Sequence, residues 1–238
     1  MANHRDERDP GLAMFRTTVP PTVLLGPISA KRGVAFVDVP LETLTRAVKA
    51  AGATVNDALL AAATMAVEAA LVADGHPVPS MLPASVPVAL RNRGGSGNAV
   101  GVMVVQLPVG EPDPPVRLAR ISAATKSAKP AARSQGTFEL TRTLWGSRLF
   151  MWLARRQRFV ALFVTNVRGP DATMRVGGAP LVEAWPVAPI QGNVRLGIAA
   201  MSYAGRLAVT VHVDAGVLQA GVAGSALGEE LARIAARS

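Results

Sequence analysis

The feature that most limits the fold of this chain is a long apolar helix near residue 60. The most apolar stretch, 58–67, has an acidic residue at each end and is about half as long as a bilayer-spanning helix. Thr54 suits the N-cap of this helix, which we expect to continue to about Ala73 and to end at Asp74-Gly75. We therefore expect a core helix, not a membrane span. Residues 1–21, charged at the start and ending in Pro20-Pro21, read as a mobile tail without a signal peptide, before one domain over 22–238.

The rest of the sequence alternates between strand-like and helix-like segments. We expect helices at 41–51, 54–73, 115–129, 138–158 and 217–236, and strands at 33–39, 85–90, 100–107, 159–167, 181–187, 194–203 and 207–213. Several of these strands look antiparallel and are interspersed with helices. This mixture indicates an α/β sandwich with a mixed sheet flanked by helices.

Composition excludes several kinds of site. The 238 residues include no Cys and only three widely spaced His, so we expect no disulfide scaffold and no metal centre. The formal net charge of +9 favours anionic partners such as a phospholipid headgroup or a phosphorylated ligand. With one Tyr and six Phe, platforms for base stacking are scarce, and we expect no nucleic-acid partner.

The start of the apolar helix carries the first candidate site. Asp57 lies three residues after Thr54, the spacing of a capping box. Because Thr54 can cap the helix, Asn56 is not needed for that role. Its carboxamide would lie beside free backbone N–H groups at the positive end of the helix, a place that can hold an oxyanion or a phosphate oxygen. The spacing alone leaves open that Asn56 simply faces solvent or caps the helix locally.

Three further segments are candidates for binding. The loop 91–98 contains Arg91 and Asn98 among glycines and could cradle a phosphate, although it also fits a solvated connection. Thr165 and Asn166 lie near the end of an apolar strand and could point into a site or form a turn. The segment 138–158 carries an aromatic stripe flanked by Arg and could lie on an anionic bilayer or pack on the sheet.

Taken together, segments from about residue 21 to 236 resemble the C-terminal half of the bacterial wax ester synthase/diacylglycerol acyltransferase (WS/DGAT) family. The segments that carry this resemblance are Leu25-Gly26-Pro27-Ile28, 53–61 (ATVNDALLA), 86–91 (VPVALR), 97–103 (GNAVGVM), 107–114 (LPVGEPDP), 164–167 (VTNV) with Gly169-Pro170, 185–189 (WPVAP), Leu196-Gly197-Ile198, 202–207 (SYAGRL) and Asp214.

The resemblance implies a chloramphenicol-acetyltransferase-like fold that forms one half of a two-half enzyme, with the active site in a tunnel between the halves. Enzymes of this family transfer a fatty acyl group from acyl-CoA to a diacylglycerol or a long-chain alcohol, which yields triacylglycerol or wax ester. Acyl-CoA is then a substrate, and no cofactor is expected. The family's Asn-Asp motif maps onto Asn56, which would position the reacting groups or the oxyanion, and onto Asp57, which would support the helix start.

One departure from the family is large. Its general base is the second His of a His-His-x-x-x-Asp-Gly motif in the N-terminal half, and this sequence has no adjacent His pair. Arg168 also stands where Pro is usual, and Ala58 where Val is common. We expect a cytoplasmic half-enzyme that needs a separate N-terminal-half chain and is inactive alone. A non-catalytic protein that binds lipid at the inner membrane face or a lipid-droplet surface, and a truncated remnant, remain alternatives.

Overall fold

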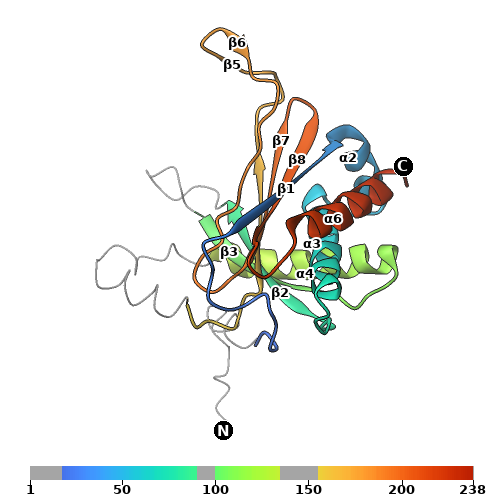
Figure 1. The fold of residues 1–238 in the computed structure, drawn as a ribbon. Coiled ribbons are helices and arrows are strands. Elements are labelled where there is room, and N and C mark those ends of the chain that lie inside the picture. The colour runs from blue at the N-terminus through green and yellow to red at the C-terminus, as the bar shows by residue number, and fades with distance from the viewer. Residues whose placement is uncertain (1–17, 90–99, 135–154, 238) are drawn as a thin grey trace.

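A computed structural model of the protein describes residues 18–89, 100–134 and 155–237 (Figure 1). The elements in chain order are β1 (Arg32–Pro40), α2 (Leu41–Ala50), α3 (Val55–Ala73), β2 (Leu82–Ala89), β3 (Val100–Leu107), α4 (Pro114–Ser134), β4 (Leu162–Arg168), β5 (Arg175–Val176), β6 (Ala179–Pro180), β7 (Leu196–Tyr203), β8 (Arg206–Asp214) and α6 (Ala220–Ala235). The main sheet has six strands in the order β1-β8-β7-β4-β2-β3, and β5 and β6 pair only with each other.

The main sheet is mixed, which confirms the predicted fold class. The pairs β1–β8, β7–β8 and β2–β3 are antiparallel. Strand β4 lies between β2 and β7 and is parallel to both. The chain returns from the end of β4 to the start of β7 through the β5–β6 hairpin and an extended segment, 181–193.

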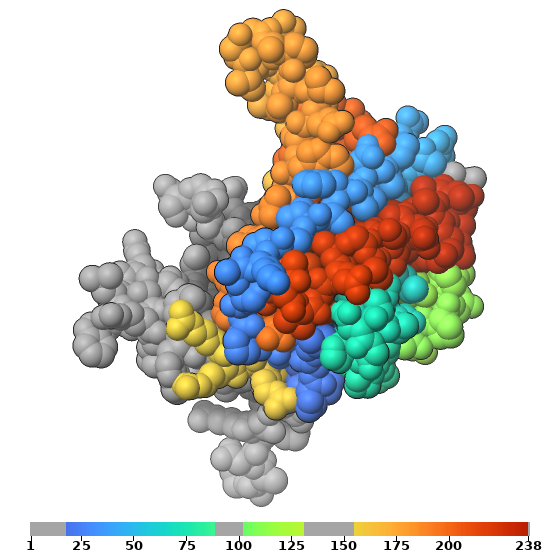
Figure 2. Space-filling model, viewed as in Figure 1, coloured from blue at the N-terminus to red at the C-terminus, as the bar shows by residue number. Residues whose placement is uncertain are grey.

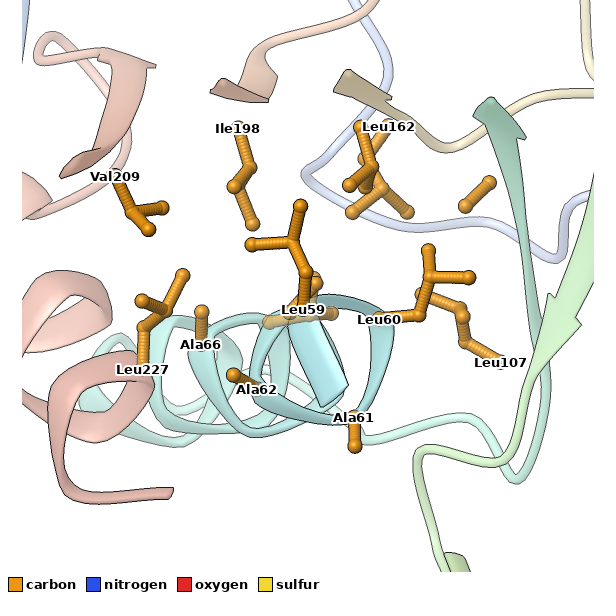
Figure 3. Close-up of a cluster of buried hydrophobic side chains, with 14 of the residues drawn as sticks. Leu59, Leu60, Ala61, Ala62, Ala66, Leu107, Leu162, Ile198, Val209 and Leu227 are labelled. Atoms are coloured by element: carbon orange, nitrogen blue, oxygen red, sulfur yellow. The ribbon is translucent and has the colours of Figure 1, made fainter. Parts of the chain in front are cut away.

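The helices α3, α4 and α6 cover one face of this sheet (Figure 1). Helix α6 packs on β1 and β8, α4 packs on β3, and α3 contacts both of these helices. Gly224 allows α6 to approach β1, because a Cβ at this position would lie 2.5 Å from the Cβ of Ala35. In the core between the layers, Leu59 and Leu60 of α3 point toward the sheet, near Ile198 and Leu107 (Figure 3).

Helix α3 is buried on nearly every side, which explains its apolar composition. It is long and apolar enough to cross a membrane by length and composition, and it is the one such helix in the part of the chain that the structure describes. However, 67% of that stretch is buried inside the protein. The helix therefore serves as the centre of the core, as the sequence indicated.

The segment 181–187 is not a strand, which corrects one prediction. It crosses the sheet face opposite the helices, where side chains of β8 contact carbonyl groups of this segment and of the next residue. The Thr210 hydroxyl donates to the carbonyl of Pro186, and Nδ1 of His212 lies 2.7 Å from the carbonyl oxygen of Ala188. Because Pro186 interrupts it and the Thr210 hydroxyl of β8 occupies the carbonyl of Pro186, the segment covers the sheet and does not join an edge.

The structure also bears on two predicted segments, the tail 1–21 and the helix 138–158. Val19 belongs to the predicted tail, yet it is buried in the core and its backbone N–H bonds to the carbonyl of Arg158. Packing therefore begins before residue 22, while residues 1–17 lie outside the described chain. Most of the helix predicted at 138–158 also lies outside it, and the described part, 155–158, is not helical.

Asp214 ties together segments that are far apart in sequence. Its carboxylate is buried and accepts hydrogen bonds from the Ser29 hydroxyl, from the Ser29 N–H (2.8 Å) and from the Gly216 N–H (3.1 Å). Arg195 Nε lies 3.8 Å from the same group. Burial by itself would raise the pKa of Asp214, but the hydrogen bonds from Ser29 and Gly216 and the charge of Arg195 outweigh it and hold the pKa below its ordinary 3.8.

We expect Asp214 to make stability depend on pH in acid. Since the pKa is lower in the folded than in the unfolded state, the stabilisation is complete above the unfolded value and is lost as the pH falls through 3.8 toward the folded value. Asp214→Asn should reduce the free energy of unfolding near pH 7 by about 1–3 kcal/mol and flatten its decline between about pH 5 and 3. Urea unfolding at several pH values measures both. An unchanged slope, equal to that of the exposed control Asp171→Asn, would remove Asp214 from this role.

Candidate functional site

The start of α3 is fixed by the capping box that the sequence predicted. The Thr54 side chain accepts a hydrogen bond from the backbone N–H of Asp57 (3.2 Å). In return, Oδ2 of Asp57 accepts from the Thr54 N–H (2.9 Å) and from its hydroxyl (2.8 Å). This reciprocal arrangement satisfies two backbone donors that a helix start otherwise leaves free.

A third hydrogen bond, from α4, occupies the other oxygen of Asp57. The hydroxyl of Thr125 lies 2.7 Å from Oδ1, and both side chains are buried. In addition, Nζ of Lys126 donates to the carbonyl of Gly52 (3.1 Å) in the connection between α2 and α3. The carboxylate of Asp57 therefore has partners on both oxygens and holds the start of α3 against α4.

We expect Thr125→Val to destabilise the protein by about 1–3 kcal/mol, because it removes the hydroxyl donor and leaves Oδ1 of Asp57 buried without it. Valine keeps the branched shape, so packing and helix propensity change little. Ser127→Ala, at an exposed position of the same helix, should change stability by about 0.5 kcal/mol or less. Chemical denaturation measures both variants, and equal effects would contradict the proposed bond.

Asn56, unlike Asp57, takes no part in the capping box. Its side chain is half-buried, at the second residue of α3, and it forms no hydrogen bond with any other residue that the structure describes. The first turn of a helix carries a partial positive charge and free N–H groups. Asn56 thus presents an amide at the positive end of α3, while Asp57 holds the start of the helix in place.

The remaining predicted site residues lie on β4 or outside the described residues. Arg91 and Asn98 lie outside the described residues. Thr165 is half-buried beside Ala199 of β7, and Asn166 is exposed beside Ala200. Neighbouring residues of a strand point to opposite faces. The side chains of Thr165 and Asn166 therefore point to opposite faces of the sheet.

Neither described histidine is placed to act as a base near Asn56. His76 follows the far end of α3, and the 19 residues of this helix span about 28 Å. His212 contacts the carbonyl of Ala188 on the sheet face opposite the helices. Among the described residues, no group of three or more His, Asp or Glu side chains could hold a metal ion.

Sequence reasoning missed Thr125 as the partner of Asp57. The two residues are 68 positions apart, and a threonine within a helix carries no local signal of a buried hydrogen bond. The nearest available hint was the pattern of α4, in which buried positions recur at Arg117, Ile121 and Thr125. This spacing places Thr125 on the packed side of the helix.

The mixed six-stranded sheet with α3, α4 and α6 on one face is the arrangement of a chloramphenicol-acetyltransferase-like domain. The sequence model of the WS/DGAT C-terminal domain matches residues 96–234, more than half of the chain. The chain therefore belongs to the WS/DGAT C-terminal domain family. Asn56 and Asp57 lie before the matched range.

Comparisons with individual proteins agree with this assignment. The chain is 30% identical over 229 residues to a probable diacylglycerol O-acyltransferase of Mycobacterium tuberculosis strain H37Rv, covering 90% of this chain and 49% of that protein. The structure is similar to the wax ester synthase/diacylglycerol acyltransferase from Marinobacter aquaeolei VT8, with a TM-score of 0.72, 21% identity, and coverage of 95% of this chain and 54% of that one. An epimerization domain of tyrocidine synthetase B shares the fold with a TM-score of 0.57, 17% identity, and coverage of 95% and 52%. The chain spans about half the length of these relatives.

Proposed function

We propose that this chain is the C-terminal half of an O-acyltransferase that moves a fatty acyl group from acyl-CoA to a diacylglycerol or a long-chain alcohol. Acyl-CoA and the lipid alcohol are its substrates, and the products are triacylglycerol or wax ester. Membership of the WS/DGAT C-terminal domain family supports the reaction class. The length ratio to the relatives supports the assignment as one half.

The observation that carries the proposal is the division of roles at the start of α3. Both oxygens of Asp57 are used to hold the helix. Asn56, one residue earlier, keeps its amide unpaired among the described residues, at the positive end of the same helix. Attack of a hydroxyl on a thioester carbonyl develops negative charge on the carbonyl oxygen, and a fixed amide donor beside helix N–H groups is suited to stabilise that charge.

The proton of the attacking hydroxyl must be taken by a base from outside the described residues. We assign this step to a His-His-x-x-x-Asp-Gly motif on an N-terminal-half partner. The second His would accept the proton from the alcohol, the alcohol oxygen would bond to the acyl carbon, and the CoA thiolate would leave. His76 and His212 are too far from Asn56, or on the wrong face of the sheet, to replace it.

Reconstitution tests the proposal. The chain is co-expressed with an N-terminal half that bears the motif, from a neighbouring reading frame, and acyl-CoA-dependent formation of neutral lipid is measured. We expect product with both halves and none with either half alone. A purified, folded complex that forms no product from acyl-CoA with either class of alcohol would overturn the proposed function.

The net charge of +9 favours one second candidate, a non-catalytic protein that binds lipid at the inner membrane face or at a lipid droplet. Co-sedimentation with vesicles that contain anionic lipid, at low and high salt, tests it. Salt-sensitive binding together with failed reconstitution would favour this candidate. Absence of binding at low salt would remove it.

A further inference from the structure

Strand β1 is an edge of the main sheet, and its outer side pairs with no strand in the described part of the chain. It pairs with β8 along all nine of its residues, from Arg32 opposite Asp214 to Pro40 opposite Arg206, and the register shifts nowhere. The strand therefore contains no bulge that would turn it away from a partner. A long, regular edge of this kind presents a row of free backbone groups to another chain.

Two hydrogen bonds at the ends of β1 show which of its residues face outward. The N–H of Ala215 donates to the carbonyl of Lys31 (3.2 Å), and the N–H of Leu41 donates to the carbonyl of Gly205 (2.9 Å). Residues of an antiparallel strand alternate between those that bond to the neighbour and those that do not. Since residues 31 and 41 both bond toward β8, the even-numbered residues between them turn their N–H and C=O groups to the free edge. These outward residues are Arg32, Val34, Phe36, Asp38 and Pro40, of which Pro40 lacks the N–H.

The outward residues are complementary to a second copy of the same strand. Two β1 strands can run antiparallel with Ala35 opposite Ala35 of the second copy. Arg32 then lies opposite Asp38 of the second copy at both ends of the paired region. Between these ends, Val34 lies opposite Phe36, again twice. Because these residues turn their backbone groups outward, each pair is a hydrogen-bonded pair, and the two strands would share about eight backbone hydrogen bonds.

The neighbouring registers fit less well. A shift of two residues in one direction places Arg32 opposite Pro40, which has no N–H to donate. The opposite shift places Arg32 opposite Phe36, and no opposite charges then face each other. A shift by an odd number of residues sets outward residues against residues whose backbone groups β8 already uses. The sequence of β1 therefore favours one register with itself.

The side chains are compatible with this register as well. The outward residues are exposed on the sheet face opposite the helices, because their odd-numbered neighbours face α6. Val34 is 37% and Phe36 is 58% exposed, and a β-branched side chain opposite an aromatic one is a favourable cross-strand pair. Asp38 forms an ion pair with Arg206, yet its side chain remains 41% exposed. It can therefore also meet Arg32 of the second copy.

Helix α6 lies along β1, and the two elements are side by side on the face of the molecule shown in Figure 2. Gly224 and Gly228 face the strand, where added Cβ atoms would lie 2.5 and 3.2 Å from its side chains. Leu227 lies on the other side, toward α3 (Figure 3). At 3.6 residues per turn, the flank that looks past the edge of the sheet carries only small, exposed residues. We call this the outer flank of α6: Gly221, Ser225 and Ala232.

The outer flank allows a second α6 to approach. Paired strands lie about 4.8 Å apart, so two sheets joined at β1 would bring their α6 helices close together. Helices that pack on each other normally keep their axes about 8–10 Å apart, and the lower distances require small side chains at the contact. The residues of the outer flank meet this requirement.

We propose that two copies of this chain associate through the edge of β1 and the outer flank of α6, around a twofold axis at Ala35. The two six-stranded sheets then form one continuous sheet. The register of the strand and the small residues of the helix are separate observations, and both fit the same symmetric partner. This association goes beyond the proposed function and does not depend on it.

Cysteine crosslinking tests the register, because the chain contains no Cys. Arg32→Cys and Asp38→Cys are made in separate full-length chains. In a hydrogen-bonded antiparallel pair the Cα atoms lie about 5.5 Å apart, within the range that a disulfide spans. A mixture of the two variants should therefore form a disulfide-linked dimer under mild oxidation. Each variant alone should not, since the two copies of one position lie about 20 Å apart along the strands.

Sedimentation of the full chain over a range of concentrations tests the association itself, and we expect the wild type to form a dimer. Val34→Pro removes an outward N–H, which an edge strand tolerates. Ser225→Arg places a long side chain on the outer flank and leaves the strand unchanged. Each should raise the dissociation constant of the dimer about tenfold or more. Ser127→Arg is the matched control at an exposed position of α4, which packs on the other edge strand, and it should associate like the wild type.

Equal thermal midpoints show that the variants are folded, and Ser225→Arg decides the test if Val34→Pro is not. A wild-type chain that stays monomeric at every concentration overturns the inference. So does a dimer that survives Ser225→Arg, or one that crosslinks in Arg32→Cys alone as readily as in the mixture. If an N-terminal-half partner abolishes the crosslink, the edge belongs to that partner and the second copy is the wrong occupant. Acyl transfer by the two-half complex is measured separately, so the proposed function can stand or fail by itself.

Discussion

Replacing Asn56 with alanine in the two-half complex is expected to lower kcat by about 10²–10³-fold, the usual effect of removing one oxyanion donor. KM for acyl-CoA should change much less, because the lost interaction is strongest in the transition state. The fold should survive, since the Asn56 side chain bonds to no other described residue and the capping box does not use it. Steady-state acyl transfer with the purified complex gives both constants.

Asn56→Asp distinguishes catalysis from support of the helix. A negative charge in the first turn interacts favourably with the helix dipole, so stability should be unchanged or rise by about 0.3–1 kcal/mol. The same charge would repel a developing oxyanion, so kcat should fall at least as far as in Asn56→Ala. If Asn56 had only a structural role, the activity of Asn56→Asp would be unchanged as long as its stability was unchanged.

Gln219→Ala is the matched control for these variants. Gln219 is also an amide at a helix start, as the N-cap residue of α6, and it is exposed. Its Nε2 bonds to Asp74, at the opposite end of α3 from Asn56. Its removal should leave kcat unchanged. Wild-type activity in the folded Asn56→Ala complex would remove Asn56 from the site.

Local features of the fold could be read from the sequence, and long-range ones could not. The capping box was predictable because Thr54 and Asp57 are three residues apart and act within one turn. The strands β1, β3, β7 and β8 were also found close to their observed bounds. By contrast, the bond between Asp57 and Thr125 depends on how two helices pack, which no local pattern encodes.

Two sequence-based predictions over 171–187 were wrong, and each error has its own physical reason. The apolar residues of 181–187 predicted a strand, but this segment lies across a sheet face where the Thr210 hydroxyl donates to the carbonyl of Pro186. The β5–β6 hairpin was missed although Gly177-Gly178 is a turn signal, because its strands are only two residues long. The composition of 171–187 indicates an apolar surface, but it does not show whether the sheet or another chain covers that surface.

A buried ion pair between α4 and α6 was also invisible from the sequence, and its disruption should have the largest effect on stability. Nη1 of Arg117 lies 2.7 Å from Oε1 of Glu230, and the two side chains are 2% and 0% exposed. The guanidinium also donates to the carbonyl of Glu111, at 3.1 and 3.0 Å. Arg233 reaches the second oxygen of Glu230 at 2.5 Å. Glu230 and Arg233 are three residues apart on α6, a spacing typical of a solvated ion pair. The carboxylate of Glu230 is nevertheless buried.

Glu230→Leu should reduce the free energy of unfolding by about 3–5 kcal/mol, because it leaves the buried charge of Arg117 without its carboxylate. Arg117→Met should cost somewhat less, because Arg233 still contacts the carboxylate of Glu230. The double variant Arg117→Met/Glu230→Leu should lose clearly less than the sum of the two, since it leaves no unpaired charge at this position. Arg120→Ala is the control on the same helix: Arg120 is 61% exposed and pairs with Glu111 at 3.0 Å, so its loss should amount to about 0–1 kcal/mol. Denaturant unfolding of the wild type, the two single variants and the double variant measures the coupling, and Arg120→Ala is unfolded beside them. Strictly additive losses would mean that the pair is not a coupled unit, and α4 and α6 would then be linked through their separate contacts with α3.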